Sequence, residues 1–255
     1  NGQIIWSVDF MKDHDARNLT WGITENLVYD GDILFCTPGG RDANVVALDR
    51  QTGRIIWKSR GSGERSGYGS PVIINLPKKK ILVTMMERSI HGFDAATGNL
   101  LWKFGHINEY SVHPHVPIYI DGYLYCTIGY GVGGVMLKVA PDGSSVTQVW
   151  KNASHDPKIG GFVVLNGRIY GAGDYNRKFF CLDWKTGNIL YEAGRAGAQQ
   201  EARRHRRVDP RGLAGREEVA PDRGRTLAGQ LFDLTRSCSR SKHQIRSTKS
   251  ETNGK

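Results

Sequence analysis

Short runs of apolar and aromatic residues recur along the first three quarters of the chain, and polar turns separate them at a nearly constant interval. The interval is marked by four turn glycines spaced 45, 45 and 44 residues apart: Gly53, Gly98, Gly143 and Gly187. The apolar runs between them are strand-like and lack the 3.6-residue spacing of a helical repeat. A unit of about 45 residues with this pattern is typical of a four-stranded propeller blade. The sequence therefore predicts an all-β fold, an arc of about four four-stranded antiparallel propeller blades.

Each repeat contains the same turn followed by an aromatic residue. The clearest copies are Ala47-Leu-Asp-Arg-Gln-Thr-Gly-Arg-Ile-Ile-Trp57 and Phe93-Asp-Ala-Ala-Thr-Gly-Asn-Leu-Leu-Trp102. A third, degenerate copy ends at Trp150, a fourth ends at Tyr191, and residues 2–6 have the spacing of the end of an earlier copy. We expect each terminal aromatic side chain to pack between neighbouring blades and to bury on the order of 150–250 Å². These docking residues are Trp6, Trp57, Trp102, Trp150 and Tyr191.

Each blade is predicted to contain four strands, A to D in chain order, with the Thr-Gly turn between strands C and D. The blades are expected at residues 23–59, 70–104, 115–151 and 161–192. Tight hairpins between strands A and B are expected at Asp30-Gly31, Asp121-Gly122 and Asn166-Gly167, because such pairs favour two-residue turns. The second blade has a longer loop at residues 76–80 instead. In the Thr-Gly turn, the Asp accepts hydrogen bonds from backbone amides and the Gly supplies a positive φ.

The turn pattern Ala-x-Asp-x-x-Thr-Gly-x-x-x-Trp resembles the tryptophan-docking repeat of the pyrroloquinoline-quinone (PQQ) family of propellers. The resemblance covers residues 1–194. Families with this repeat include the quinoprotein alcohol dehydrogenases and the outer-membrane assembly lipoproteins of the BamB type, both usually eight-bladed. Eight blades would need roughly 360 residues at this period, whereas the chain supplies four blades and one further strand. The chain is therefore expected to be a fragment of a longer protein.

Composition changes sharply near Gly194, which predicts two parts at residues 1–194 and 195–255. The first part carries 20 Lys and Arg against 18 Asp and Glu, and the second carries 15 against 7. The basic character thus belongs to the tail, and the propeller itself gives no charge argument for nucleic acid or an anionic membrane. No apolar run is long enough for a transmembrane segment, and no signal peptide is expected in this chain.

The basic tail has three possible explanations: a disordered segment that binds RNA or membrane, a helical extension, or frame-shifted translation in place of a further blade. Its sequence switches abruptly, within a blade, toward Arg, Gly and Ala, as in Ala202-Arg-Arg-His-Arg-Arg207. This abrupt switch favours the frameshift. The four cysteines, Cys36, Cys126, Cys181 and Cys238, lack CxxC spacing, and the first three fall in strand patterns, which favours buried thiols over disulfides or a zinc site.

The family resemblance implies two possible functions. We expect a binding or scaffolding module in the periplasm or outside the cell, with no cofactor. The alternative is a fragment of a PQQ-dependent alcohol dehydrogenase, an enzyme class that the resemblance links to PQQ, calcium, a vicinal disulfide and a carboxylate base. No Cys-Cys pair is present, and neither a catalytic residue nor a metal ligand can be carried over to a numbered position.

Candidate ligand contacts concentrate in the connections from strand D of one blade to strand A of the next. In propellers these connections lie on one face near the central channel, so they can share a concave site for a protein or small-molecule ligand. Five of the six histidines before residue 195 fall there, and His91 is the exception. The competing interpretation is that these are ordinary solvated loops. The predicted site residues are Arg65, Tyr68, His113, His115 and His155.

Overall fold

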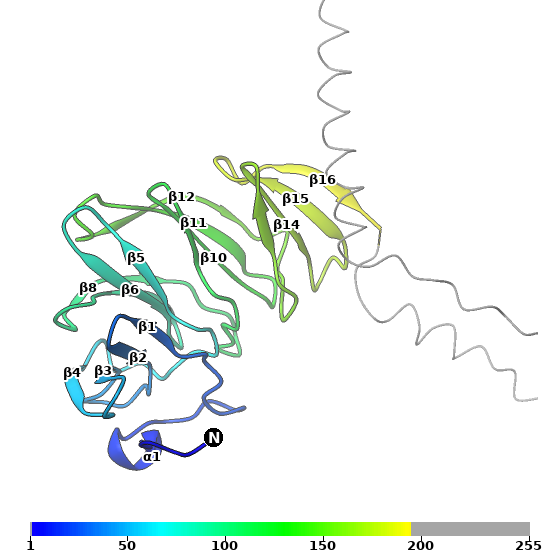
Figure 1. Cartoon of the computed structure of the whole chain (residues 1–255). Helices are drawn as coiled ribbons and strands as arrows, with labels where there is room; N and C mark the ends of the chain where they lie inside the picture. Colours follow the sequence, from blue (N-terminus) through cyan, green and yellow to red (C-terminus); the bar gives the residue numbers. More distant parts are fainter. Residues whose placement is uncertain (1, 195–255) are drawn as a thin grey trace, which may run out of the picture. The chain divides into compact units, whose positions relative to one another are not determined.

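The structure of the protein is a computed structural model that describes residues 2–194 (Figure 1). The expectations for residues 195–255, including the basic tail and Cys238, concern a part of the chain outside this range. Within it, sixteen strands form four separate four-stranded antiparallel sheets, and strands that are consecutive in the chain are neighbours in each sheet. This confirms the predicted all-β architecture of four-stranded blades.

The strand bounds follow the predicted blades to within one residue at each C-terminal end. The first sheet contains β1 (Val28–Asp30), β2 (Ile33–Cys36), β3 (Val45–Asp49) and β4 (Ile55–Ser59). The second contains β5 (Val72–Asn75), β6 (Lys80–Met85), β7 (Ser89–Asp94) and β8 (Leu100–Gly105). The third contains β9 (Ile118–Ile120), β10 (Tyr123–Ile128), β11 (Gly133–Val139) and β12 (Val146–Asn152). The fourth contains β13 (Val163–Leu165), β14 (Arg168–Ala172), β15 (Phe179–Asp183) and β16 (Ile189–Ala193).

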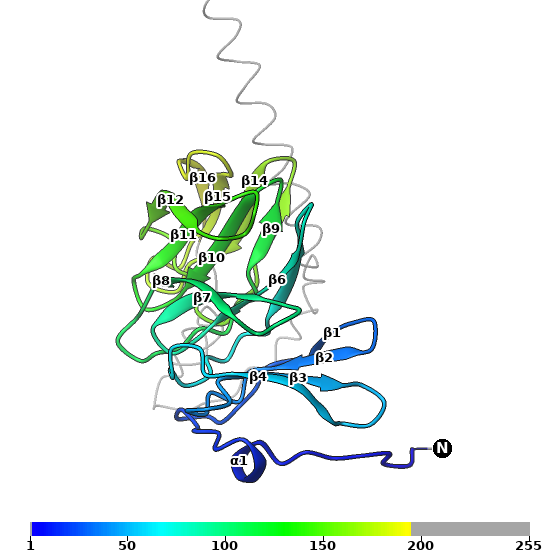
Figure 2. The ribbon, with the colours of Figure 1, turned by 90° about the vertical axis from the view of Figure 1, so that its left-hand side faces the viewer.

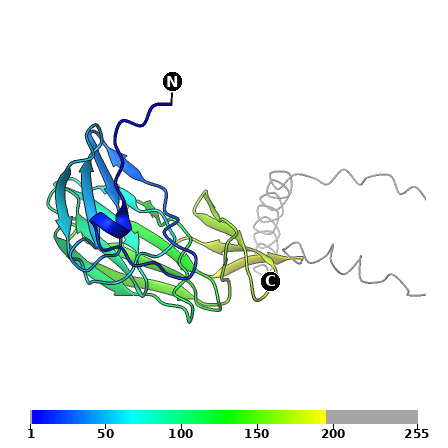
Figure 3. The same cartoon turned by 90° about the horizontal axis from the view of Figure 1, so that it is seen from below.

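The sheets of the described region follow one another in chain order (Figure 2). Apolar side chains from facing sheets form the cores between them, such as Ile81 and Val83 of β6 with Leu124 of β10 and Val135 of β11. The one helix among residues 2–194, α1 (Phe10–Asp13), lies beside the first sheet, and Phe10 packs against the apolar cluster on that side of the sheet (Figure 3). Burial between sheets, rather than within one, therefore provides the core.

The turns between strands show the predicted chemistry, with one shift of register. Asp121 and Gly122 both have positive φ, at 48° and 87°, as do Asn166 and Gly167, at 50° and 69°, which is the requirement of a type I′ hairpin turn. In the first blade the turn is Gly31-Asp32 and not Asp30-Gly31, because β1 extends to Asp30, which pairs with Ile33. The longer loop of the second blade is present between β5 and β6.

The Asp-x-x-Thr-Gly turns are held by the carboxylate that begins them. Asp49 Oδ1 accepts from the backbone N–H groups of Gln51 and Thr52 at 3.0 and 2.8 Å, and Gly53 has a φ of 72°. In the degenerate third copy, Gly143 N–H donates to Ala140 O, three residues back, whereas Gly53 N–H donates to Asp49 O, four residues back. The third turn is therefore tighter than the other turns.

Aromatic side chains of the repeat contact the turn of the following blade. The indole N–H groups of Trp57 and Trp150 donate to the backbone oxygens of Ala95 and Trp184 at 3.2 and 3.0 Å, and both rings lie against a turn glycine. Trp6 makes the same pair of contacts with Arg50 O and Gly53 of the first blade.

Burial of the five expected docking residues is not uniform. Trp102 and Trp150 are buried, whereas Trp6, Trp57 and Tyr191 are half-buried. Trp102 lies over Gly92 of its own blade, and its indole N–H has no partner among the described residues. Trp102 does not rest on the turn glycine of the next blade as Trp57 and Trp150 do. In the tighter third turn that glycine, Gly143, faces Leu76 and Ile81.

Substituting Trp150 and Trp102 by Phe tests the hydrogen bond to the turn, because both indoles are buried and only that of Trp150 donates to a backbone oxygen. We expect Trp150→Phe to lower the free energy of unfolding by about 1 kcal/mol more than Trp102→Phe, since it leaves the Trp184 carbonyl without its donor. Urea denaturation followed by circular dichroism measures the difference. Equal losses would show that the hydrogen bond contributes nothing beyond the packing of the ring.

Candidate functional site

The D-to-A connections contact one another. They are residues 14–27, ahead of the first blade, and residues 60–71, 106–117 and 153–162, between blades. The Arg17 guanidinium donates to Gly63 O at 2.7 Å, and the Thr24 hydroxyl donates to Tyr68 O at 3.2 Å. Gly69 lies directly against the backbone of residues 113–115, where an added Cβ would meet two carbonyl oxygens. Each connection therefore packs on the next, as expected for segments that gather on one face of a propeller.

Two of the predicted site residues, Arg65 and His113, meet at Glu87. The Arg65 guanidinium donates from Nε and Nη2 to the two carboxylate oxygens of Glu87 at 3.1 and 2.7 Å. His113 Nε2 lies 2.8 Å from the backbone oxygen of the same residue. The paired hydrogen bonds from Arg65 lower the pKa of Glu87 below its ordinary value. Arg65 is thus occupied by an ion pair within the packing between connections.

Tyr68 lies next to this cluster and is 8% exposed. Its ring packs against the Trp21 ring at a centroid distance of 5.8 Å, and its hydroxyl accepts from the Trp21 backbone N–H at 3.4 Å. Its side chain therefore links two connections.

The other two predicted residues reach toward the fourth blade. His115 Nε2 lies 2.8 Å from Pro157 O, in the next connection. His155 Nε2 lies 2.8 Å from the Glu192 carboxylate of β16, which also pairs with Lys178. The structure therefore brings Arg65, Tyr68 and His113 together, and places His115 and His155 at separate contacts further along the chain. Whether any of the five contacts a ligand stays a prediction.

Histidines of these connections are buried, so the alternative interpretation of solvated loops is wrong for them. The five are between 0 and 6% exposed: His14, His106, His113, His115 and His155. Desolvation is the largest effect on each ring and lowers its pKa, to about 3 for His106. These imidazoles are therefore neutral at pH 7, and those of His113, His115 and His155 form hydrogen bonds through Nε2 inside the packing.

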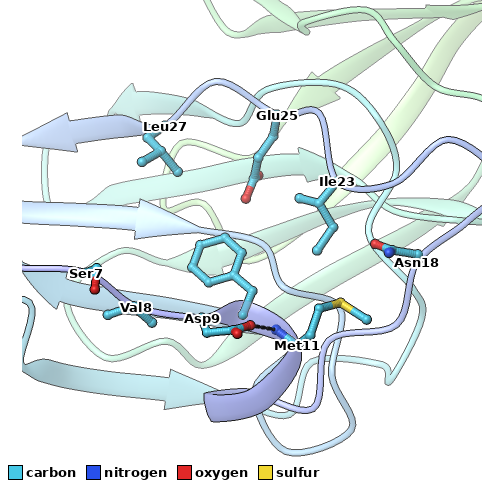
Figure 4. Close-up of a pocket in the computed structure, with 9 residues that line it drawn as sticks. Ser7, Val8, Asp9, Met11, Asn18, Ile23, Glu25 and Leu27 are labelled. Carbon is cyan, nitrogen blue, oxygen red and sulfur yellow. Dashed lines mark hydrogen bonds between the residues drawn. The ribbon is translucent and has the colours of Figure 1, made fainter.

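A pocket of about 670 Å³ opens on the side of the first blade that faces the N-terminal segment, and the sequence analysis did not identify it (Figure 4). Five apolar and four polar residues line it: Val8, Phe10, Met11, Ile23 and Leu27 with Ser7, Asp9, Asn18 and Glu25. In Figure 4, Glu25 lies between Ile23 and Leu27 along one side of the pocket. Asp9 and Met11 lie along the opposite side. The pocket is thus made by two segments that precede β1.

Glu25 is the polar side chain of this pocket that the surrounding structure holds most firmly. Its Oε1 accepts from the Thr37 backbone N–H at 2.6 Å, and its Oε2 contacts the Thr37 hydroxyl. That hydroxyl lies 3.2 Å from the hydroxyl of Ser66. Burial raises the pKa of Glu25 to about 7 against the lowering effect of the Thr37 hydrogen bonds. The repeat period could have marked this position, because Glu25 precedes Ser70 by 45 residues and His115 by 90.

Three cysteines of the described strands, Cys36, Cys126 and Cys181, are buried thiols, as predicted. Burial, and to a smaller extent the neighbouring Glu25 charge, raises the pKa of Cys36 to about 12. A thiol of this kind is an inert packing group at neutral pH. No helix within residues 2–194 has the length and apolar character needed to cross a bilayer.

Four consecutive antiparallel sheets, packed face to face and joined by D-to-A connections, define a partial β-propeller. Residues 1–125 match the family model described as outer membrane protein assembly factor BamB. The resemblance to PQQ-repeat propellers, drawn from the Asp-x-x-Thr-Gly turns, is thereby confirmed.

Curated relatives are quinoproteins. Quinoprotein alcohol dehydrogenase PedH of Pseudomonas putida is 24% identical over 205 aligned residues, which cover 76% of this chain and 31% of that protein. Quinoprotein ethanol dehydrogenase of Pseudomonas aeruginosa is 30% identical over 76 residues, which cover 29% of this chain and 12% of that protein. The chain thus spans less than a third of the length of either relative.

Among solved structures, BamB from Moraxella catarrhalis aligns with a TM-score of 0.48 at 15% identity, over 70% of this chain and 54% of that one.

The PQQ enzymes are associated with calcium, whose ligands are several oxygen atoms around one ion. Among the residues that the structure describes, no three His, Cys, Asp or Glu side chains are grouped as a metal ion would require. Arg65 of the connection at residues 60–71 pairs with Glu87, which lies between β6 and β7 of the second blade.

Because His106 is buried, we expect the folded chain to lose stability in acid. Its pKa is about 3 in the folded chain and 6.5 when solvated, so between these values the unfolded chain binds a proton that the folded chain does not. The free energy of unfolding should therefore fall as the pH drops from 6.5 toward 4. Substituting His106→Gln should reduce this slope by up to about 1.4 kcal/mol per pH unit. Urea denaturation across this pH range measures it, and an unchanged slope in the variant would contradict the assignment.

Proposed function

We propose that the chain is a binding or scaffolding module that acts in the periplasm or outside the cell. The observation that supports this most directly is the continuous packing of the D-to-A connections, in which Arg17, Thr24 and His115 each bond to the backbone of a neighbouring connection. Such a surface is organised before a partner arrives, so little ordering entropy is lost on binding. The family description of an outer-membrane assembly factor, which matches residues 1–125, agrees with this function and location.

The aromatic contacts between blades are part of the same proposal. We infer that Trp6, Trp57 and Trp150 are docking residues, because each places its ring on a turn glycine and its indole N–H on a backbone oxygen beside it. Their role is to fix the angle between blades, and so the geometry of the face that the connections form. Trp102 and Tyr191 occupy the same position of the repeat, and we assign them the packing role alone.

PQQ-dependent alcohol oxidation is the second candidate function. It is supported by the similarity to two quinoprotein dehydrogenases, one of which aligns over 76% of this chain. Against it stands the use of Arg65, Glu87 and His113 in contacts within the packing. As a fragment of such an enzyme, the chain would need ligands for calcium and PQQ from further residues of a longer protein.

Reconstitution with PQQ and calcium tests whether this chain can carry out the second function with its own residues. The protein is mixed with PQQ, calcium, ethanol and an electron-accepting dye, and dye reduction is followed by absorbance. We expect no reduction above the rate seen when the protein is omitted, and no change in Tm on adding PQQ. Calcium-dependent turnover that requires both the protein and PQQ would overturn the proposal of a binding module.

A further inference from the structure

The pocket beside the first blade has the volume of a small-molecule site. Its volume of about 670 Å³ falls within the range of roughly 300–1,000 Å³ that is usual for ligand pockets. Phe10, Ile23 and Leu27 provide apolar walls, and the polar side chains are few. An organic molecule could therefore bury an apolar body here while one polar group is recognised.

The charge of the pocket lining has one sign. Its ionisable side chains are two carboxyl groups, those of Asp9 and Glu25, and no Lys, Arg or His is among the nine lining residues. Asp9 already caps α1, because its Oδ1 accepts from the backbone N–H groups of Met11 and Lys12 at 3.0 and 3.2 Å. Both carboxyl groups therefore keep acceptor capacity, Asp9 at Oδ2 and Glu25 at the second acceptor site of each oxygen, and Glu25 is the one that lies between the apolar Ile23 and Leu27.

Glu25 is positioned before any ligand arrives. Both of its oxygens contact Thr37, and the Thr37 hydroxyl is in turn within 3.2 Å of Ser66. A carboxylate oxygen can accept two hydrogen bonds, so each still has one acceptor site. A fixed carboxylate at an apolar wall favours a cationic donor, because a hydrogen bond between charged groups is stronger than one between neutral groups.

We propose that this pocket binds a small organic cation, a primary ammonium carried on an aliphatic or aromatic body. The ammonium group donates to Glu25, and the body packs on Phe10, Ile23 and Leu27. An anion of the same size is repelled by the two carboxyl groups, and a neutral alcohol of the same shape forms a weaker hydrogen bond. The site shares residues 18–27 with the first D-to-A connection and adds residues 7–11, which lie outside the connections.

Proton binding at Glu25 competes with such a cation. Burial raises the pKa of Glu25 to about 7, so the carboxyl group is largely neutral at pH 6 and ionised at pH 8. The ionisable groups near it are Asp9 on the opposite wall, Asp13, whose carboxylate accepts from the Asp9 backbone N–H, and the buried Cys36 thiol of β2. Cation affinity should therefore rise with pH between these values.

Calorimetry with three probes of one shape tests the proposal on the 255-residue protein: benzylammonium, benzyl alcohol and benzoate. At pH 8 we expect benzylammonium to bind about tenfold more tightly than the alcohol, the difference expected for one charge-assisted hydrogen bond, and benzoate not to bind. At pH 6 the preference for the cation should shrink to less than about threefold. Equal affinities of cation and alcohol at pH 8, or no binding of the cation, would overturn the proposal.

Two variants and a control assign the preference to Glu25. Glu25→Gln keeps the shape and removes the charge, so it should abolish the preference for the cation, whereas Glu109→Gln, on the exposed surface outside the pocket, should leave it unchanged. Met11→Trp fills the pocket from a half-exposed position and should remove binding of the cation without lowering Tm. If Glu25→Gln does not fold, Met11→Trp decides, and cation binding that persists in this variant contradicts the proposal.

Discussion

At Trp6, Trp57 and Trp150 an indole ring rests on the turn glycine of the next blade, and in our proposal this contact fixes the angle between blades. Trp57 lies on Gly98, whose φ of 76° presents bare backbone to the ring, and a Cβ added there would lie 2.5 Å from the indole. The indole N–H then satisfies the oxygen of Ala95, one residue after the Asp that shapes the turn. One short sequence thus serves two purposes, because the Asp and Gly that form the turn also create the surface on which the ring of the preceding blade rests.

Once the blades are set at this spacing, the D-to-A connections meet side by side and their polar groups must find partners away from water. His113, His115 and His155 do this through Nε2 as neutral rings, without the cost of burying a charge. His113 and His115 are two residues apart and yet bond to opposite neighbours, Glu87 in the second blade and Pro157 in the following connection. Histidines in these loops suggest a ligand site when only the sequence is known. In the structure they join one connection to the next.

The blade number, strand order and turn chemistry could be predicted because each depends on residues close in sequence. The period follows from the spacing of Gly53 and its equivalents, and the type I′ hairpins follow from local pairs such as Asn166-Gly167. Burial of His113 could not be predicted, since its partner oxygen at Glu87 is 26 residues away and belongs to another blade. A register shift recurs between the third and fourth strands of every blade, at Ala47/Leu48 in the first, and the sequence carries no clear mark of it.

Comparing Glu25 with the residues at the same position of the other repeats gives information beyond the number of blades. Its position directly before the first strand is occupied one period later by Ser70 and two periods later by His115, and both of those side chains bond to a neighbouring connection. Glu25 bonds instead to Thr37 within its own blade, and it lines a pocket together with residues 7–11, a segment that is not a blade. The position joins connections in the second and third copies, whereas in the first copy it faces an irregular segment, and this difference is the basis of the proposed site. The equivalent positions differ in the hydrogen-bond partner of each side chain as well as in residue type. This difference in partner distinguishes the Glu25 carboxyl group from the buried histidines.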